Sequence, residues 1–438
     1  MESNESLILQ YVGCQVGGLY TFKEANRDGC YNDTGSVLVI PHGDQTNTFS
    51  LTYEYDIRED NDNDRTLQSL STRADKEMKA CDVCPYHEDF QLFLNYYGDA
   101  DYANRWIMGA SYRRQTNFKT GMGEADFSTF EYKPALAEAM SKGAVSMSVL
   151  MYVIGRFEDA IHECDKTCSI NQCDDGPVHS LDEAVAFYAG SLQGKDGSGD
   201  GRFLYEFADR MAIDFRTAGE DMDDDVGTSF VNLQIFDNFK KAQLALLQGY
   251  CNVAQDHKRA VVNLMKVPLV QSILKIADHR EKRDSAVTEN SEKIEAEGAT
   301  YAAALLPWLY QCNKNDAQIL YENMRIGSSA SKVRFSEVKT ALERNYDCLG
   351  ITCQQVGGIW TVNGYASGAE PCGNWNTSAS SAGGKAGVIA GATIAVVCAV
   401  VLLGFLALRL KRAKQHRRRM AQTKRQRSGN IAAVTEIS

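Results

Sequence analysis

The stretch Glu297-Gly-Ala-Thr-Tyr-Ala-Ala-Ala-Leu-Leu306 predicts a helix of small and apolar residues with one acid at its head. Glu297, Tyr301 and Leu305 recur at helical spacing, so the carboxylate and the phenol share a face with core residues. A second stretch, Glu183-Ala-Val-Ala-Phe-Tyr-Ala-Gly-Ser-Leu192, has the same character. These two helices predict a domain with two pseudo-equivalent halves.

The rest of the chain also shows mainly helical periodicity. Long helices are predicted over Leu136 to Glu163, over Phe236 to Arg280 with a break at Pro268, and over Glu292 to Gln311. Strand-like alternation is confined to Ser36 to Ile40 and Phe49 to Tyr55. The predicted fold class is therefore mainly α.

Residues 386–408 contain no charged side chain and predict a transmembrane helix. At ~1.5 Å rise per residue this segment is long enough to cross a ~30 Å hydrocarbon core. Residues 409–438 hold ten Lys or Arg and one Glu, which predicts a basic cytosolic tail by the positive-inside rule. Residues 361–385, rich in Gly, Ser and Ala, are predicted to form a stalk. We expect a single-pass protein of the plasma or endosomal membrane with an extracellular N-terminal domain.

The predicted extracellular part is strongly acidic. The whole chain carries −11, of which the tail supplies +9, so residues 1–408 carry about −20. Such a surface repels phosphates and attracts cations. A nucleic-acid partner is therefore not expected.

The cysteine content indicates disulfide bonding. Cys398 lies inside the predicted span, and twelve cysteines precede it, an even number that suits disulfides on the oxidising side of a membrane. Spacing favours local pairs such as Cys81 with Cys84 or Cys353 with Cys372, and leaves the other pairings open. A zinc site at Cys81 and Cys84 is the weaker alternative, because no second pair stands at matching distance. Sequons at Asn4, Asn32 and Asn376 predict glycans.

Two segments of the chain resemble each other around cysteine. Cys14-Gln-Val-Gly-Gly-Leu-Tyr-Thr, followed by Cys30, matches Cys353-Gln-Gln-Val-Gly-Gly-Ile-Trp-Thr, followed by Cys372. The second copy closes a domain, and residues 1–10 lack the pattern of a signal peptide. We therefore expect residues 1–45 to be the C-terminal remnant of an upstream repeat unit.

The acids on core-facing helical positions need partners, because an isolated buried carboxylate is costly. One possible partner of Glu297 is an Arg or a helix cap; the other is a hard cation such as trivalent iron, which suits carboxylate and phenolate oxygens. His162 is a further candidate ligand, since Glu158 and Asp159 lie one helical turn before it. No nucleophile elbow, phosphate loop or H-E-x-x-H motif occurs, so an enzyme is not expected.

Three segments and the C-terminal closure resemble the algal iron-assimilating proteins and the diatom phytotransferrins. They are Phe90-Gln-Leu-Phe-Leu-Asn-Tyr-Tyr-Gly-Asp-Ala-Asp-Tyr-Ala-Asn-Arg-Trp106, Leu181 to Leu192, Glu297 to Pro307, and the closure from Cys348 to Gly358. The resemblance spans roughly residues 85–360 and implies a helical iron-assimilation-like domain, which we place at residues 46–360. It implies binding of ferric iron at the cell surface with carbonate as synergistic anion, followed by internalisation, with endocytic machinery as a further partner.

The motif positions that the resemblance indicates as metal ligands are Tyr97, Asp99, Glu183, Glu297 and Tyr301, with His162 added on chemical grounds. Glu183 and Glu297 are expected to face a common cleft, and Arg105 or Arg210 to hold the anion. The alternative function is a non-enzymatic surface interaction or adhesion protein. In that case the inward acids would pair with basic side chains and the protein would not respond to iron.

Overall fold

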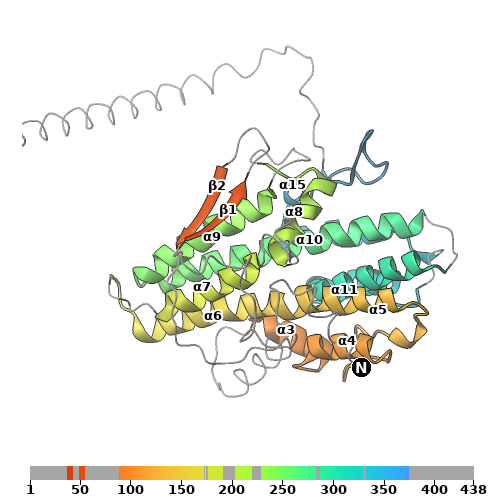
Figure 1. Cartoon of the computed structure of the whole chain (residues 1–438), viewed down its shortest axis with the longest axis horizontal. Coiled ribbons are helices and arrows are strands. Elements are labelled where there is room, and N and C mark those ends of the chain that lie inside the picture. The colour runs from red at the N-terminus through yellow and green to blue at the C-terminus, as the bar shows by residue number, and fades with distance from the viewer. Residues whose placement is uncertain are drawn as a thin grey trace, which may run out of the picture. The chain divides into compact units, whose positions relative to one another are not determined.

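The computed structural model describes residues 88–171, 173, 176–190, 203–219, 228–282, 287–328 and 332–373, and the backbone of 37–42 and 49–54. All of them belong to one compact unit, residues 1–374. The helices of this unit (Figure 1) are α3 (Glu88–Tyr97), α4 (Tyr102–Ser111), α5 (Lys133–Gly143), α6 (Leu150–Thr167), α7 (Gly176–Ala189), α8 (Leu204–Phe215), α9 (Phe230–Leu247), α10 (Cys251–Glu281), α11 (Glu289–Cys312), α12 (Lys314–Met324), α13 (Phe335–Glu343), α14 (Tyr346–Leu349) and α15 (Cys353–Val356). A 3₁₀ turn, η2, covers Phe127–Thr129. The prediction of a mainly helical, disulfide-bonded fold is confirmed.

One continuous helix organises the domain. Pro134 occupies the first turn of α5, where a missing N–H costs nothing, and α5 runs through the π-helical turn η3 (Ala144–Val149) directly into α6. This confirms the long helix predicted over Leu136 to Glu163. Helix α11 packs against α5 and helix α7 packs against α6, so the two acid-bearing helices flank different parts of one rod (Figure 1). Equivalence of two halves stays a prediction.

The predicted break at Pro268 is wrong. Pro268 lies inside α10, and the chain turns instead between α9 and α10, at Gln248–Tyr250. Gly249 has φ +69°, and a Cβ there would lie 2.3 Å from the Ser169 carbonyl oxygen, so only glycine allows this close turn. Pro268 is tolerated within α10 because the helix around it is buried and tertiary packing holds it in place.

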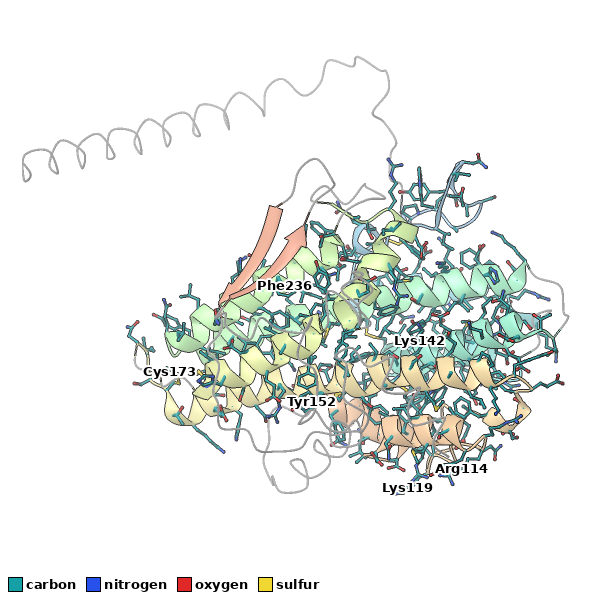
Figure 2. All side chains as sticks on the ribbon, viewed as in Figure 1. Arg114, Lys119, Lys142, Tyr152, Cys173 and Phe236 are labelled. Carbon is teal, nitrogen blue, oxygen red and sulfur yellow. A yellow bond between two sulfur atoms is a disulfide. The ribbon has the colours of Figure 1, made fainter. Side chains whose placement is uncertain are left out.

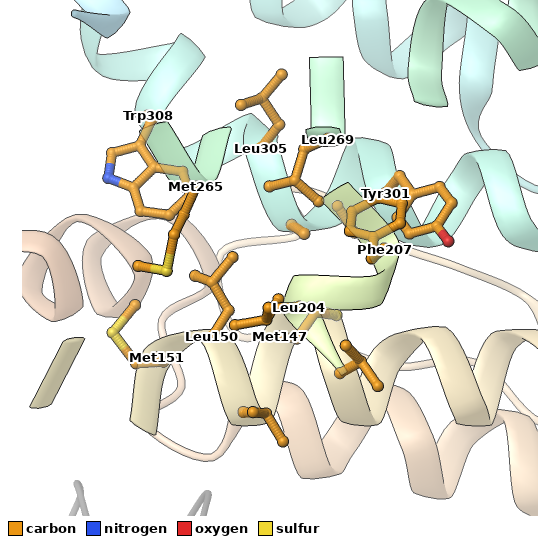
Figure 3. Packing of buried hydrophobic residues seen from close by; sticks show 14 of the residues in the cluster. Met147, Leu150, Met151, Leu204, Phe207, Met265, Leu269, Tyr301, Leu305 and Trp308 are labelled. Atoms are coloured by element: carbon orange, nitrogen blue, oxygen red, sulfur yellow. The ribbon is translucent and has the colours of Figure 1, made fainter. Parts of the chain in front are cut away.

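Helices α10 and α11 form the centre of the core. Their close contact depends on Gly298, where a Cβ would lie 2.6 Å from Ile276 Cγ2. Leu269 and Leu305 belong to one buried cluster with Met147, Leu150 and Leu204, which lie on η3, α6 and α8 (Figure 3). Tyr301 stacks on Phe207, with 4.8 Å between the ring centroids. Thus α11, predicted over Glu292 to Gln311, is confirmed and carries core residues on most of its surface.

Four disulfides fasten the described helices. They join Cys164 to Cys251, Cys168 to Cys173, Cys312 to Cys348, and Cys353 to Cys372. The predicted pairing of Cys353 with Cys372 is confirmed. Cys14, Cys30, Cys81 and Cys84 lie outside the described residues.

Short strands complete the described unit. Strands β1 (Val37–His42) and β2 (Phe49–Glu54) lie where alternation predicted strands, and they pair antiparallel with Val37 opposite Glu54. Strands β3 (Trp360–Thr361) and β4 (Gly364–Tyr365) form a small hairpin before Cys372. Residues 361–373, which we assigned to the stalk, therefore carry this hairpin and the disulfide that closes the domain.

Among the described residues, one helix, α10, is long and apolar enough to cross a membrane. Most of that helix is buried inside the domain, which is typical of a core helix. The predicted span at residues 386–408, the predicted tail at 409–438 and the sequons lie outside the described residues.

Candidate functional site

Glu297 and Tyr301 form the centre of a polar cluster at the edge of the core. They lie one turn apart on α11, and the Tyr301 hydroxyl donates a hydrogen bond to Glu297 Oε1 at 3.3 Å. Lys142 Nζ of α5 lies 3.6 Å from the same oxygen and 3.7 Å from Glu138 Oε2. These ion pairs are longer than ordinary charge-assisted hydrogen bonds. The Glu297 side chain is 32% exposed whereas Tyr301 is buried, so the cluster reaches solvent through its carboxylate.

Arg210 of α8 completes this group, which we call the Glu297 cluster: Glu138, Lys142, Arg210, Glu297 and Tyr301. Burial raises the pKa of Tyr301 well above its usual value, and Glu297 raises it further, whereas the nearby charge of Arg210 lowers it. The guanidinium itself is only loosely paired, with Nε 3.9 Å from Glu206 Oε1. The cluster thus combines phenol and carboxylate oxygens with cationic groups that suit an anion.

Glu183 lies in a different environment, the Glu183 cluster: Tyr152, Arg156, Asp159 and Glu183. The Tyr152 hydroxyl donates to Glu183 Oε1 at 2.6 Å, and Arg156 Nη1 lies 3.7 Å from Glu183 Oε2. Arg156 also pairs with Asp159 one turn along α6. A phenol, two carboxylates and a guanidinium therefore meet between α6 and α7. Tyr152 was not predicted, although its position one turn before Arg156 was visible in the sequence.

The expected common cleft for Glu183 and Glu297 is not what the contacts indicate. Lys142 and Tyr152 contact the two acids from positions ten residues apart on one helix, about 15 Å at the usual rise. Figure 2 shows these two side chains at separate places along it. Both acids also lie well inside their helices rather than at the heads, so a helix cap cannot be their partner.

Tyr97, Asp99 and Arg105 lie around the turn between α3 and α4. The Tyr97 side chain is fully buried, and its hydroxyl donates to the Ala303 carbonyl at 2.7 Å. Asp99 forms an ion pair with Arg105, the Nε–Oδ2 distance being 2.5 Å. Asp99, a predicted metal ligand, and Arg105, a predicted anion ligand, are thus paired with each other. Tyr97 is a core residue whose hydroxyl bonds to the backbone.

His162 is half-exposed near the end of α6. Partial burial and Lys166 lower its pKa, whereas Asp165 and Glu163 oppose that shift. Glu158, expected to assist His162, points instead into the interior, where Lys258 Nζ lies 2.7 Å from its Oε1. The expected grouping of Glu158 with His162 is therefore not observed.

Lys258 is the centre of a buried charge network that sequence reasoning missed. Its Nζ lies 3.3 Å from Asp89 Oδ2 as well as close to Glu158, and Trp308 Nε1 donates to Asp89 Oδ1 at 2.8 Å. Burial lowers the pKa of Lys258, but the two carboxylates outweigh this effect and raise it. Four helices far apart in sequence, α3, α6, α10 and α11, meet here. No sequence spacing could indicate that meeting.

The sulfur atoms of Cys164, Cys168 and Cys173 also lie close together. All three are in disulfides, and a metal ligand must be a thiolate, so they do not form a metal site. Figure 2 shows Cys173 at one end of the bundle.

The fold and its polar clusters define a class: a disulfide-bonded helical domain in which part-exposed carboxylates lie beside buried phenols and basic groups. Residues 112–373, more than half of the chain, match the family described as low iron-inducible periplasmic protein. The chain belongs to this family, the algal iron-assimilating proteins, and is related to iron assimilation under iron starvation. No curated protein and no solved structure matches it.

Proposed function

We propose that this protein binds ferric iron outside the cytoplasm, with carbonate as accompanying anion, and that it delivers the iron by internalisation. Family membership supports iron as the ligand. The observation that carries the proposal is the contact of Tyr301 with Glu297 beside Arg210. Two of the predicted metal ligands and one predicted anion ligand belong to one cluster.

The chemistry of the Glu297 cluster suits a trivalent cargo. A highly charged cation can replace the phenolic proton of Tyr301, which then leaves to solvent, and can bind a Glu297 oxygen in place of Lys142. The displaced Lys142 and Arg210 would then face the bound carbonate. Since phenol and carboxylate both compete for protons, acidification weakens such binding, which suits release in an acidic compartment. We propose a binding protein and not an enzyme.

We further propose that residues 386–408 anchor the protein in the plasma membrane, with residues 409–438 in the cytosol and the helical domain outside. Protease digestion of intact cells tests this arrangement. The domain should be cleaved from outside while an epitope at the C-terminus stays protected. Cleavage of the C-terminal epitope would overturn the orientation.

The experiment for iron binding is a titration of the full chain in detergent with ferric nitrilotriacetate, with and without bicarbonate. We expect a visible tyrosinate-to-iron charge-transfer band that needs bicarbonate. Tyr301→Phe together with Glu297→Gln should remove binding at this cluster. The control is Glu322→Gln, which changes an exposed acid on α12. No saturable binding by the wild type would favour the surface interaction protein instead.

A further inference from the structure

A second oxygen-rich group lies where α7, α8 and α9 meet. We call it the Asp209 cluster: Tyr188, Tyr205, Asp209 and Asn232. Asp209 Oδ1 accepts hydrogen bonds from Ser229 N and Asn232 Nδ2, each at 2.7 Å. The Tyr188 hydroxyl donates to Asn232 Oδ1. Asn232 thus joins the phenol of α7 to the carboxylate of α8.

The carboxylate of Asp209 lacks a positive partner among the described residues. Its contacts there are a backbone N–H and an amide, and only Oδ1 receives them. Burial raises the pKa of Asp209 to about 6 although both hydrogen bonds lower it. Two buried acids do contact a cation, since Glu158 contacts Lys258 and Asp316 contacts Arg344. Buried Glu292 instead accepts from two backbone N–H groups. A carboxylate in this setting is stabilised by a cation.

Two phenols lie near this carboxylate. Tyr205 is one turn before Asp209 on α8, so their side chains share a face. Its hydroxyl is buried beside Thr228 without a hydrogen bond of ordinary geometry. The negative charge of Asp209 raises the pKa of both Tyr205 and Tyr188, beyond the larger effect of burial. Asn232 links the Tyr188 hydroxyl to Asp209 through its side-chain amide.

We propose that Tyr188, Tyr205 and Asp209 form a second hard-cation site, which takes a trivalent ion such as ferric iron, with Asn232 as a positioning residue. Every donor atom is an oxygen, and two phenols with one carboxylate can neutralise a trivalent charge. Each phenol loses its proton to solvent when the ion binds, so no other reactant is needed. The choice of ferric iron as the ion rests on the proposed function, whereas the site is a different one.

The competing explanation is purely structural. Ser229 is the N-cap of α9, and Asp209 accepts the N–H of that residue, so the acid also fixes the start of α9. A structural role predicts that substitutions change stability and leave metal stoichiometry unchanged. Asp209→Asn keeps the Oδ1 acceptor, and Tyr205→Phe keeps the packing of the ring. These two variants separate the explanations.

The test is ferric titration of the full chain with bicarbonate, read by bound iron per chain and by the charge-transfer band. We expect the wild type to bind two ions, and Asp209→Asn or Tyr205→Phe to bind one fewer. Tyr346→Phe is the matched control, a buried tyrosine on α14. Urea unfolding without iron shows whether each variant is folded; if Asp209→Asn is not, Tyr205→Phe decides.

The outcomes distinguish the two proposals. Unchanged stoichiometry and band in a folded Tyr205→Phe protein would overturn the second site, whatever the Glu297 variants do. Loss of one ion in Tyr205→Phe and of the other in Tyr301→Phe with Glu297→Gln would support both sites. Loss of all iron in Tyr205→Phe alone would support the Asp209 cluster and remove the Glu297 cluster from the proposed function.

Discussion

Glu183 and Glu297 lie on two different helices, α7 and α11, and both contact the continuous helix that runs from α5 to α6. Glu183 of α7 accepts from Tyr152 of α6, and Glu297 of α11 lies beside Lys142 of α5. The π-helical turn η3 separates these contacts. This segment therefore sets the spacing between two polar clusters that each combine an acid, a phenol and a basic group. π-helical turns inside α-helices are frequent at functional sites.

Arg210 should determine the bicarbonate dependence of iron binding. In Arg210→Met the guanidinium that faces the Glu297 cluster is lost, so we expect weaker binding with bicarbonate and little change without it. A fork of N–H donors matches a planar oxyanion better than an ammonium does, so Arg210→Lys should restore the effect only in part. Ferric titration of each protein with and without bicarbonate measures this dependence. Equal dependence in the wild type and in Arg210→Met would assign the anion to another group.

Lys258→Met should strongly destabilise the domain. The substitution leaves Glu158, which is 2% exposed, without its cation, and breaking a buried ion pair typically costs about 3–5 kcal/mol. Adding Glu158→Gln should recover a large part of this loss, because the remaining acid, Asp89, still accepts from Trp308. Urea unfolding of the wild type, both single variants and the double variant gives the coupling energy. A double variant as unstable as Lys258→Met would contradict this account.

Removal of the Cys164–Cys251 disulfide should cost more than removal of Cys168–Cys173. The first closes a loop with a sequence separation of 87 and the second one of 5. Loop-closure entropy assigns about 4–5 kcal/mol to the first and about 2 kcal/mol to the second. Paired Cys→Ser variants compared by urea unfolding under non-reducing conditions test the order. Equal losses would show that chain entropy does not decide these contributions.

Lys266 should make stability rise with pH in the mildly alkaline range. Burial lowers its pKa to about 8, from 10.5, while its Nζ donates to Asn263 Oδ1 and the Leu349 carbonyl. Between these two pKa values the unfolded chain binds more protons than the folded one, so unfolding becomes less favourable as pH rises.

The comparison with Lys266→Met isolates that effect from other titrations. Between pH 7.5 and 9.5 the unfolding free energy of the wild type should gain about 2 kcal/mol relative to the variant. Urea midpoints at several pH values provide the measurement. Parallel pH curves for the two proteins would show that Lys266 keeps an ordinary pKa.

The sequence by itself determined what depends on local pattern. Helical periodicity gave the positions of α11 and of the rod from α5 to α6, alternation gave β1 and β2, and short spacing gave the Cys353–Cys372 pair. Glu297 and Tyr301 could be predicted to lie together because a helix places residues four apart on one face. The expectation that proline ends a helix was wrong at Pro268, where burial of α10 outweighs the local preference of proline.

Only the tertiary structure decided which elements meet. Three relationships join residues from different helices. The charge of Arg210 acts on Tyr301, Lys258 pairs with Asp89 and Glu158, and Asn232 links Tyr188 to Asp209. Such contacts follow from how whole helix faces pack, which is a property of the complete set of apolar surfaces and not of any single spacing. The residue types for hard-cation chemistry were therefore visible in the sequence, while their grouping into separate sites was set by packing.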